Sequence, residues 1–290
     1  MTPSTNDLET LRTWIGRSKE TVEVVSVDWC RKMEETLDRD ATLADGDALP
    51  PLWHFITHLP SARLSALDRD GHSMRGSFLP PVALPRRMWA GGRFTFHGDI
   101  HLGEEVAKRS TIENVVMKEG RTGHLCFVTV AHQLVVDGDV RIEEEQDLVY
   151  REDPAPDAPV PEQKPAPDQA DFERTVTPSE VMLFRYSALT FNSHRIHYDR
   201  EYAREVEGYK GLVFHGPLTA TLLADLAASE SGRSLATFSF RGLAPLFDDA
   251  PFAISGISGT DGHQLWATTP SGGVAMQASA NRDWGPRGHR

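Results

Sequence analysis

The sequence predicts an α+β protein with two related halves, each an antiparallel sheet preceded by helical segments. Three observations predict this fold class. Runs of β-branched and apolar residues separated by turn signals occur in both halves. Residues 94–105, F-T-F-H-G-D-I-H-L-G-E-E, match residues 238–249, F-S-F-R-G-L-A-P-L-F-D-D, and each copy stands just before such runs. A proline-rich segment lies between the copies, so we infer a duplicated domain.

Helical patterns precede the strands in both halves. In the first half, a pattern from Leu8 to about Leu37 is interrupted near residues 20–25, and Pro51-Leu52 opens a short apolar stretch. In the second half, Gly216-Pro217-Leu218 opens a segment whose leucines recur at helical spacing. Proline suits the first turn of a helix because its missing amide donor would have no partner there. We therefore expect a buried helix that begins at Gly216.

The strands are predicted from apolar runs and the turns that bound them. Asp137-Gly138 lies between two β-branched runs and predicts a hairpin, because both residue types tolerate positive φ. Each half is expected to form an antiparallel meander. The expected strands are residues 106–117, 125–136 and 140–150 in the first half, and 252–257, 264–268 and 274–280 in the second.

A proline-rich segment marks the predicted domain boundary. Six of the 19 prolines lie between Pro154 and Pro167, in a stretch without aromatic residues. Proline fixes φ and lacks an amide donor, so we expect an extended, semi-rigid connector there. The predicted domains are residues 1–152 and 171–290, joined by a linker at 153–170.

Composition narrows the function classes. The formal net charge of −12 argues against a surface for nucleic acid or for an anionic membrane. The two cysteines, Cys30 and Cys126, lack the spacing of a zinc site or a disulfide framework, so we expect buried thiols and no metal. The N-terminus is polar and acidic, and no stretch approaches the ~20 apolar residues of a membrane span. We expect a cytoplasmic protein.

One segment has the polar groups of a catalytic site. Residues 187–202 read S-A-L-T-F-N-S-H-R-I-H-Y-D-R-E-Y and place Asn192, His194 and His197 within six positions. A second polar signature, Phe214-His215-Gly216-Pro217, follows at the start of the predicted buried helix. A single histidine is more often a structural residue than a catalyst, but the two signatures together favour chemistry.

These two signatures resemble the MaoC-like hotdog dehydratases and the R-specific enoyl-CoA hydratases. The residues that carry the resemblance are F-N-S-H-R-I-H-Y-D and V-F-H-G-P-L-T-A-T-L-L-A-D-L, with L-P-R-R-M-W-A-G-G-R in the first half. The chain is most similar to the two-hotdog branch with mesaconyl-CoA hydratase and the mitochondrial-type β-hydroxyacyl-thioester dehydratase. The resemblance implies a double hotdog, in which two antiparallel sheets each wrap around a central helix.

The resemblance also implies catalytic roles. The family motif is an aspartate followed five residues later by a histidine, and these positions are Asn192 and His197 here. Asparagine cannot accept a proton at neutral pH, so Asn192 would orient the water and His197 would transfer the proton. The amide of Gly216, at a helix N-terminus, would stabilise the negative charge that forms on the thioester oxygen. Asp199 is expected to cap or pair locally.

Further residues are expected to bind the substrate. His194 takes the asparagine position of the family's N-P-x-H segment, and His215 precedes the helix. Arg185 and Arg195 flank the motif and could meet a carboxylate or the CoA phosphates. In the first half, which lacks the N-x-x-x-x-H pattern, Arg87 and Trp89 would meet anionic and apolar parts of the substrate. This half is expected to shape the acyl site without catalysing the reaction.

The favoured function is a hydro-lyase that adds water to an α,β-unsaturated acyl-CoA, most of all mesaconyl-CoA. Itaconyl-CoA hydratase and the β-hydroxyacyl-thioester dehydratase of fatty-acid metabolism stay open. A hotdog thioesterase, with Asp225 as the only acid between Gly216 and Ala228, is an alternative of another class. A non-catalytic thioester sensor is a third. The CoA thioester is the substrate and no cofactor is expected. The pairing usual between hotdog sheets is expected within one chain or in a homodimer.

Overall fold

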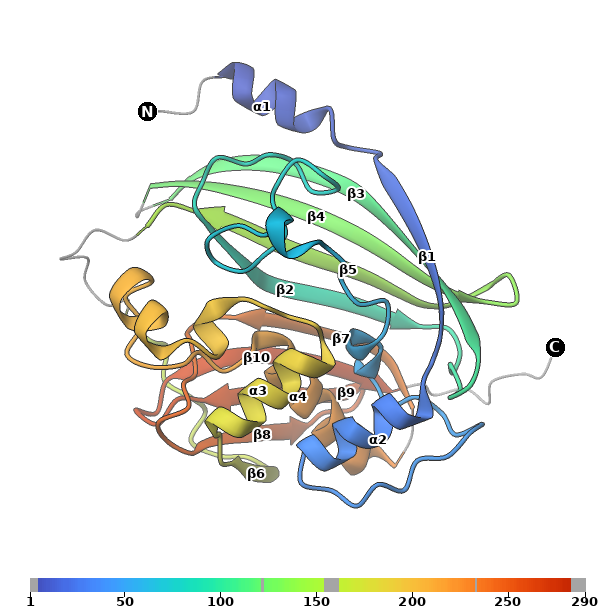
Figure 1. Cartoon of the computed structure of the whole chain (residues 1–290). Helices are drawn as coiled ribbons and strands as arrows, with labels where there is room; N and C mark the ends of the chain where they lie inside the picture. Colours follow the sequence, from blue (N-terminus) through green and yellow to red (C-terminus); the bar gives the residue numbers. More distant parts are fainter. Residues whose placement is uncertain (1–4, 121–122, 154–161, 233, 283–290) are drawn as a thin grey trace.

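The computed structural model describes residues 5–120, 123–153, 162–232 and 234–282 (Figure 1). Ten strands form one antiparallel sheet in the order β1-β3-β4-β5-β2-β7-β10-β9-β8-β6. The first half supplies β1 (Ser18–Val24), β2 (Arg86–Phe96), β3 (Glu105–Gly120), β4 (Gly123–Val136) and β5 (Asp139–Arg151). The second half supplies β6 (Phe172–Val176), β7 (Leu235–Gly242), β8 (Phe252–Ser258), β9 (Gly262–Thr268) and β10 (Val274–Arg282). The six predicted strands are confirmed within a few residues.

The two halves join where β2 pairs with β7. Phe94 pairs with Phe238, and these are matching positions of the internal repeat. A residue that pairs with its own equivalent lies on the two-fold axis that relates the copies, so the duplicated halves meet about such an axis. The separate sheets expected from the resemblance are therefore wrong in one respect. They form a single continuous sheet, because the β2–β7 ladder satisfies two edges that would otherwise be open.

The buried helix of the second half is α4 (Gly216–Ser231), as predicted. It packs against β7, β8, β9 and β10, and Gly232 ends it in the left-handed conformation. Every residue from Leu218 to Ala227 is buried and most of them are leucine or alanine, so this part of the helix is buried on every side. Helix α3 (Glu180–Leu189) precedes it and begins at Ser179, whose side chain accepts a hydrogen bond from the Met182 amide.

The first half has no equivalent of α4 among the described residues. The stretch after Pro51 forms a single 3₁₀ turn, η1 (Trp53–Ile56), so the expected second central helix is wrong. His58 adopts a positive φ and Pro60 follows it, and both stop a helix from continuing. Instead α2 (Val27–Thr36) packs against α3, and the Trp29 side chain donates a hydrogen bond to the Leu189 carbonyl (2.9 Å).

The predicted interruption near residues 20–25 is strand β1, which separates α1 (Thr5–Arg12) from α2. Figure 1 shows α1 beside β3, at the part of the sheet away from α2, α3 and α4. The described residues form three hydrophobic clusters: a large one around α4, a smaller one that contains Leu11, Ile112 and Val128, and a third that contains Ile196 and Val213. No helix in the described parts of the chain is long and apolar enough to cross a membrane. Most of the proline-rich segment lies outside the described residues, so the predicted linker and domain limits stay predictions.

Candidate active site

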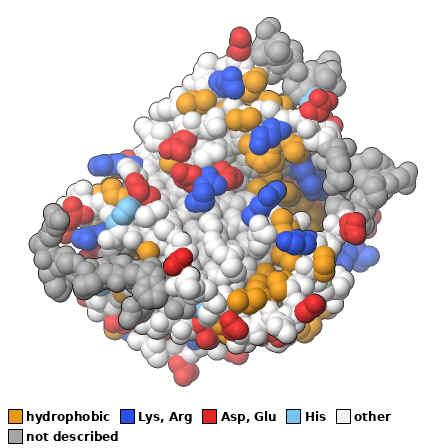
Figure 2. Space-filling view, turned by 180° about the vertical axis from the view of Figure 1, so that it is seen from behind, with side chains coloured by type: hydrophobic (Ala, Val, Ile, Leu, Met, Phe, Trp, Pro, Cys, Tyr) orange, Lys and Arg blue, Asp and Glu red, His pale blue; other side chains and the backbone are white. Residues whose placement is uncertain are grey.

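A cavity of about 2530 Å³ lies at the N-terminal end of α4 and is lined by both halves of the chain. His197 and Gly216 both line it, and they are joined there by Asn192 and His194. The first half contributes His72, Arg87 and Trp89 to its wall. Figure 2 shows hydrophobic side chains beside Lys and Arg side chains along part of the back face of the molecule. The cavity brings the two sequence signatures of the second half together.

His197 is positioned by the backbone around it. It ends the 3₁₀ turn η3 (Arg195–His197), and its Nδ1 donates a hydrogen bond to the Val213 carbonyl at 2.7 Å. Since Nδ1 carries the proton, Nε2 has the lone pair of the neutral ring. Burial lowers the pKa of His197 to about 4, against a smaller opposing effect of the Val213 carbonyl. The imidazole is therefore neutral at pH 7 and able to accept a proton at Nε2.

His215 packs against the His197 ring and lies outside the cavity lining. The two rings stack with centroids 3.7 Å apart, and His215 Nε2 hydrogen-bonds with Ser187 Oγ at 2.9 Å. His215 is fully buried and does not line the cavity, and burial holds its pKa well below the ordinary value. The structure thus places this predicted substrate-binding residue behind the His197 ring, outside the cavity lining.

The start of α4 faces open space. A Cβ at Gly216 would meet nothing within 4 Å, so a ligand atom can approach the backbone closely. The Gly216 amide is in the first turn of the helix, where amide groups have no partner within the helix. Pro217 has no amide proton, so it leaves the Gly216 and Leu218 amides as the donors nearest to the helix end. This geometry suits an oxygen that becomes negative during a reaction.

Asn192 lies just beyond the end of α3. Its backbone amide donates to the Ser187 carbonyl at 2.8 Å, and its Oδ1 accepts a hydrogen bond from the His194 amide at 3.0 Å. Because Oδ1 is occupied by this turn, the Nδ2 amide group is the part of Asn192 that remains for a ligand. Asn192 lines the cavity, as expected for a residue that orients water.

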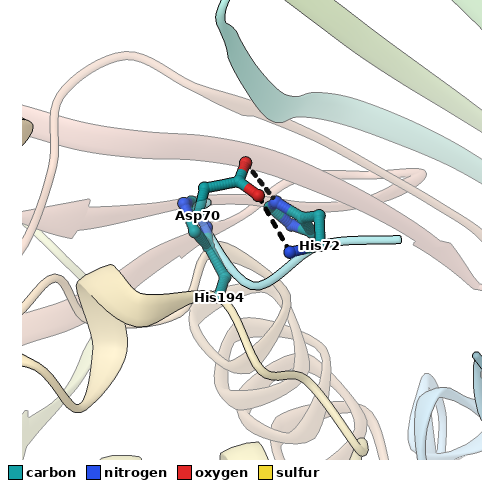
Figure 3. Close-up of side chains that lie close together, drawn as sticks. All are labelled: Asp70, His72 and His194. Carbon is teal, nitrogen blue, oxygen red and sulfur yellow. Dashed lines mark hydrogen bonds and ion pairs between the residues drawn. The ribbon is translucent and has the colours of Figure 1, made fainter. Parts of the chain in front are cut away.

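The first half brings an acid and a histidine to the same site (Figure 3). Asp70 Oδ2 accepts a hydrogen bond from His72 Nδ1, and Oδ1 accepts one from the His72 amide, both at 2.9 Å. The His72 ring lies 4.1 Å from the ring of His194. Sequence reasoning missed Asp70 and His72. The sequence signal that could have identified them is the segment D-R-D-G-H, in which an acid, a glycine and a histidine follow one another in a loop.

The loop is held in place by close backbone contact. A Cβ at Gly71 would lie 1.9 Å from the Ser193 carbonyl oxygen, and the Arg195 amide donates to the Asp70 carbonyl at 2.9 Å. Asp70, His72 and His194 have one ligand atom each within 4.8 Å of one another, so in the described residues this is a group that could hold a metal ion. Although burial favours the neutral acid, hydrogen bonds from His72 hold the pKa of the Asp70 carboxyl below its ordinary value.

Two arginines beside this loop have no acidic partner in the described part of the chain. Arg75 donates to the carbonyls of Val82, Leu84 and Pro85 at 2.8, 2.6 and 2.6 Å. Its guanidinium also lies over the Tyr150 ring, 5.7 Å from the centroid. Arg87 lines the cavity, and it lies close enough to His72 to help burial lower the pKa of that ring. The neighbouring Arg86, by contrast, pairs with Asp153 (2.9 Å) and Glu207 (3.3 Å). Arg87 is thus a cation beside the histidines with no counterion among the residues that the structure describes.

The remaining predicted residues lie in different places. Trp89 lines the cavity and contacts the rings of Phe55 and Phe240 edge-on. Arg185 does not line it, and its guanidinium reaches the Glu35 carbonyl on α2. Arg195 does not line it either, because its side chain pairs with Asp199 at 2.7 Å on the surface. The local role expected for Asp199 agrees with this pair. Neither arginine is placed to meet a ligand in the cavity.

A neutral histidine and an open helix start in one cavity, on a sheet duplicated about a two-fold axis, define a double-hotdog protein of the hydratase and dehydratase class. A family model described as "Hydroxyacyl-thioester dehydratase type 2" matches residues 52–248. The chain belongs to this family, Htd2, whose members are carbon–oxygen lyases. The family resemblance expected from the two signatures is confirmed.

Relatives and solved structures agree with this assignment. "Mesaconyl-C(4)-CoA hydratase" of Chloroflexus aurantiacus is 46% identical over 268 residues, which cover 92% of this chain and 95% of that protein. The mitochondrial "Hydroxyacyl-thioester dehydratase type 2" of Schizosaccharomyces pombe is 30% identical over 71% of this chain and 77% of its own length. HtdX of Mycobacterium tuberculosis has the same fold, with a TM-score of 0.68 at 19% identity, covering 91% of this chain and 99% of that one. The predicted double-hotdog fold class is confirmed.

Proposed function

We propose that the protein reversibly adds water to the double bond of an α,β-unsaturated acyl-CoA, and that mesaconyl-CoA is the substrate, with citramalyl-CoA as the product. The observation that carries the proposal is the shared cavity of His197 and Gly216. A thioester whose oxygen meets the Gly216 amide has its neighbouring carbons within the same cavity as His197 Nε2. These are the two groups that hydration needs, one for the charge and one for the proton.

Each of the three residues has a defined role. Water attacks Cβ, and the electron pair of the double bond moves toward the thioester oxygen, where the first turn of α4 stabilises it. His197 Nε2 exchanges a proton with the reacting groups, since its Nδ1 is held by the Val213 carbonyl. Asn192 orients the water through its amide group. No cofactor takes part, and the CoA thioester is the only small molecule that the reaction requires besides water.

The proposal of mesaconyl-CoA as the substrate rests on the positive charge of Arg87 in the cavity and on the name of one relative. Mesaconyl-CoA carries a free carboxylate beyond the double bond, and Arg87 is a cavity cation with no ion pair in the described residues. A CoA phosphate would lie far from the catalytic histidines, whereas Arg87 acts on the pKa values of His72 and His194. The relative of Chloroflexus aurantiacus is named for this acyl group. The Htd2 family match supports the dehydration of β-hydroxyacyl thioesters as the second candidate.

The acid of the thioesterase alternative, Asp225, does not reach the cavity. Asp225 belongs to the far end of α4 from Gly216 and pairs with Arg39 at 2.8 Å. It does not line the cavity, so it has no route to a thioester carbonyl there. Release of free CoA thiol during turnover would nevertheless favour that function over hydration.

The proposal is tested with a panel of enoyl-CoA esters, following the loss of the conjugated absorbance. We expect hydration of mesaconyl-CoA, and a decrease in kcat of about 100-fold or more in His197→Ala, because general acid–base groups contribute 10²–10⁴-fold. His97→Ala is the control, since His97 is an exposed histidine paired with Glu143 and does not line the cavity. Full activity of His197→Ala would overturn the assigned role, and the absence of any hydration would overturn the function.

A further inference from the structure

Hydration of an enoyl thioester involves two proton transfers. One proton leaves the water as its oxygen bonds to Cβ, and one arrives at Cα. Asn192 cannot carry a proton at neutral pH, and Nδ1 of His197 is committed to the Val213 carbonyl. The family segment therefore offers His197 Nε2 alone for both transfers, and a second group in the cavity would divide them between two atoms.

The first half supplies a histidine whose Nε2 can accept a proton. Because a carboxylate only accepts hydrogen bonds, the Asp70 contact fixes the proton of His72 on Nδ1 and makes Nε2 the proton-accepting atom. His72 lines the cavity, with 23% of its side chain exposed. Figure 3 shows that Asp70 contacts both the ring and the backbone of His72, so the pair is rigid.

Three histidine rings lie in succession along the cavity. The ring centroid of His72 lies 4.1 Å from that of His194, and the centroid of His194 lies 5.4 Å from that of His197. The Asp70–His72 pair of the first half therefore reaches the same cavity as His197 and Gly216, where the thioester oxygen binds in the proposed function.

We propose that His72, oriented by Asp70, is a second proton-transfer group in this cavity and acts on the water that attacks Cβ. This inference rests on the proposed hydration. His72 Nε2 takes a proton from water as the water oxygen bonds to Cβ, and the electron pair of the double bond becomes the enolate. A proton passes from His72 to His197 through water in the cavity that both rings line, and His197 delivers it to Cα as the electron pair of the oxygen re-forms the carbonyl. Water has been added, and both rings end neutral.

Asp70 acts in this scheme as a positioning residue. It selects the tautomer of His72 and stabilises the imidazolium that forms during the transfer. The charged and titratable groups near His72 in the described residues are Asp70 and Arg75 from the same loop region, Arg87 from β2, His194 and His197. Burial and Arg87 lower the pKa of His72, whereas Asp70 raises it. Removal of the Asp70 charge therefore lowers this pKa further and moves the acidic limb of the pH profile to lower pH.

The test compares His72→Gln and Asp70→Asn with the wild-type enzyme on the best enoyl-CoA of the panel. We expect His72→Gln to lower kcat about 100-fold with KM within threefold, because the lost group acts in proton transfer rather than in binding. We expect Asp70→Asn to lower kcat about 10-fold and to move the acidic limb of kcat/KM to lower pH, a shift that a purely structural role does not produce. The matched control is His97→Gln, another histidine paired with a carboxylate in the first half.

Three results would overturn this inference. The first is a kcat of His72→Gln within threefold of an active wild type, which leaves the proposed hydration intact. The second is an unchanged acidic limb in Asp70→Asn. The third is loss of wild-type activity in a chelator and its return with Zn²⁺, which would make Asp70, His72 and His194 metal ligands instead. A wild type that hydrates no ester of the panel would overturn the proposed function itself.

Discussion

Two histidines of the cavity have partners of different charge. His197 Nδ1 is held by the Val213 carbonyl, and His72 Nδ1 is held by the Asp70 carboxylate. Burial lowers the pKa of both rings, and in each case the partner opposes this effect. Both rings therefore favour the neutral form, with the proton fixed on Nδ1.

Arg87 is expected to determine the preference for a dicarboxylic acyl group. Arg87→Gln removes the cavity cation, so we expect the ratio of kcat/KM for mesaconyl-CoA over crotonyl-CoA to fall about 100-fold, in the range found when one partner of a desolvated charge pair is removed. Steady-state kinetics on both esters measures the ratio.

Arg93→Gln is the control for this change. Arg93 lies on the same strand, pairs with Glu145 and Asp147 at 2.6 Å each, and does not line the cavity. An unchanged ratio in Arg87→Gln would show that the second carboxylate binds elsewhere or that the substrate has none.

At the scale of elements, the loop of Asp70 depends on one glycine. Gly71 has a φ of +89°, and a Cβ there would lie 1.9 Å from the Ser193 carbonyl oxygen. We expect Gly71→Ala to push the loop away from His194 and to lower kcat at least 10-fold, as measured by steady-state hydration. Gly76→Ala separates the two causes, because Gly76 has a φ of +88° but its nearest atom to an added Cβ is 3.6 Å away. Equal losses in the two variants would mean that backbone strain alone is responsible.

Elements with strong local signals were predictable from the sequence. The hairpin at Asp137-Gly138 and the helix from Gly216 follow from turn chemistry and from leucine spacing, and both are where we expected them. The prediction of a helix after Pro51 was wrong. The apolar pattern there resembles that of a helix, but Pro60 stops a helix from continuing, and only a 3₁₀ turn forms. Local patterns also could not show that β2 and β7 pair, since the two strands are distant in sequence.

The site was predictable mainly in its second half, with Arg87 and Trp89 as the predicted cavity residues of the first. His197 and Gly216 belong to short motifs, so the sequence placed them together, and the structure puts them in one cavity. Asp70 and His72 lie more than a hundred residues from His194, and only the duplicated fold brings them to it. Arg185 and Arg195 were expected near a ligand because they flank the motif. Their side chains point to α2 and to Asp199, since sequence proximity does not fix side-chain direction.

For the whole molecule, buried neutral histidines make the stability dependent on pH. Burial lowers the pKa of His197 to about 4 and that of His132 to about 3, whereas an unfolded histidine titrates near pH 6.5. Between these values the unfolded chain binds more protons, so the free energy of unfolding falls as the pH falls from 6.5 towards 4. We expect Tm to fall by several degrees over this range.

Thermal denaturation by circular dichroism at a series of pH values measures this dependence. His132→Gln removes one of the titrating groups, so its Tm should fall less steeply with acid than the Tm of the wild type. His97 is exposed, so the variant His97→Gln should retain the wild-type dependence of Tm on pH. A Tm that is constant between pH 6.5 and 4 would contradict the burial of these rings.

The ladder between Phe94 and Phe238 also changes how assembly depends on concentration. Two identical subunits would have to find each other to build such a sheet, and dilution would separate them. In this chain the contact is intramolecular, so the cleft between the halves forms at any protein concentration. Each half has also been free to diverge on its own. One copy has kept the long inner helix, and the other has given that space to a loop with an acid and a histidine.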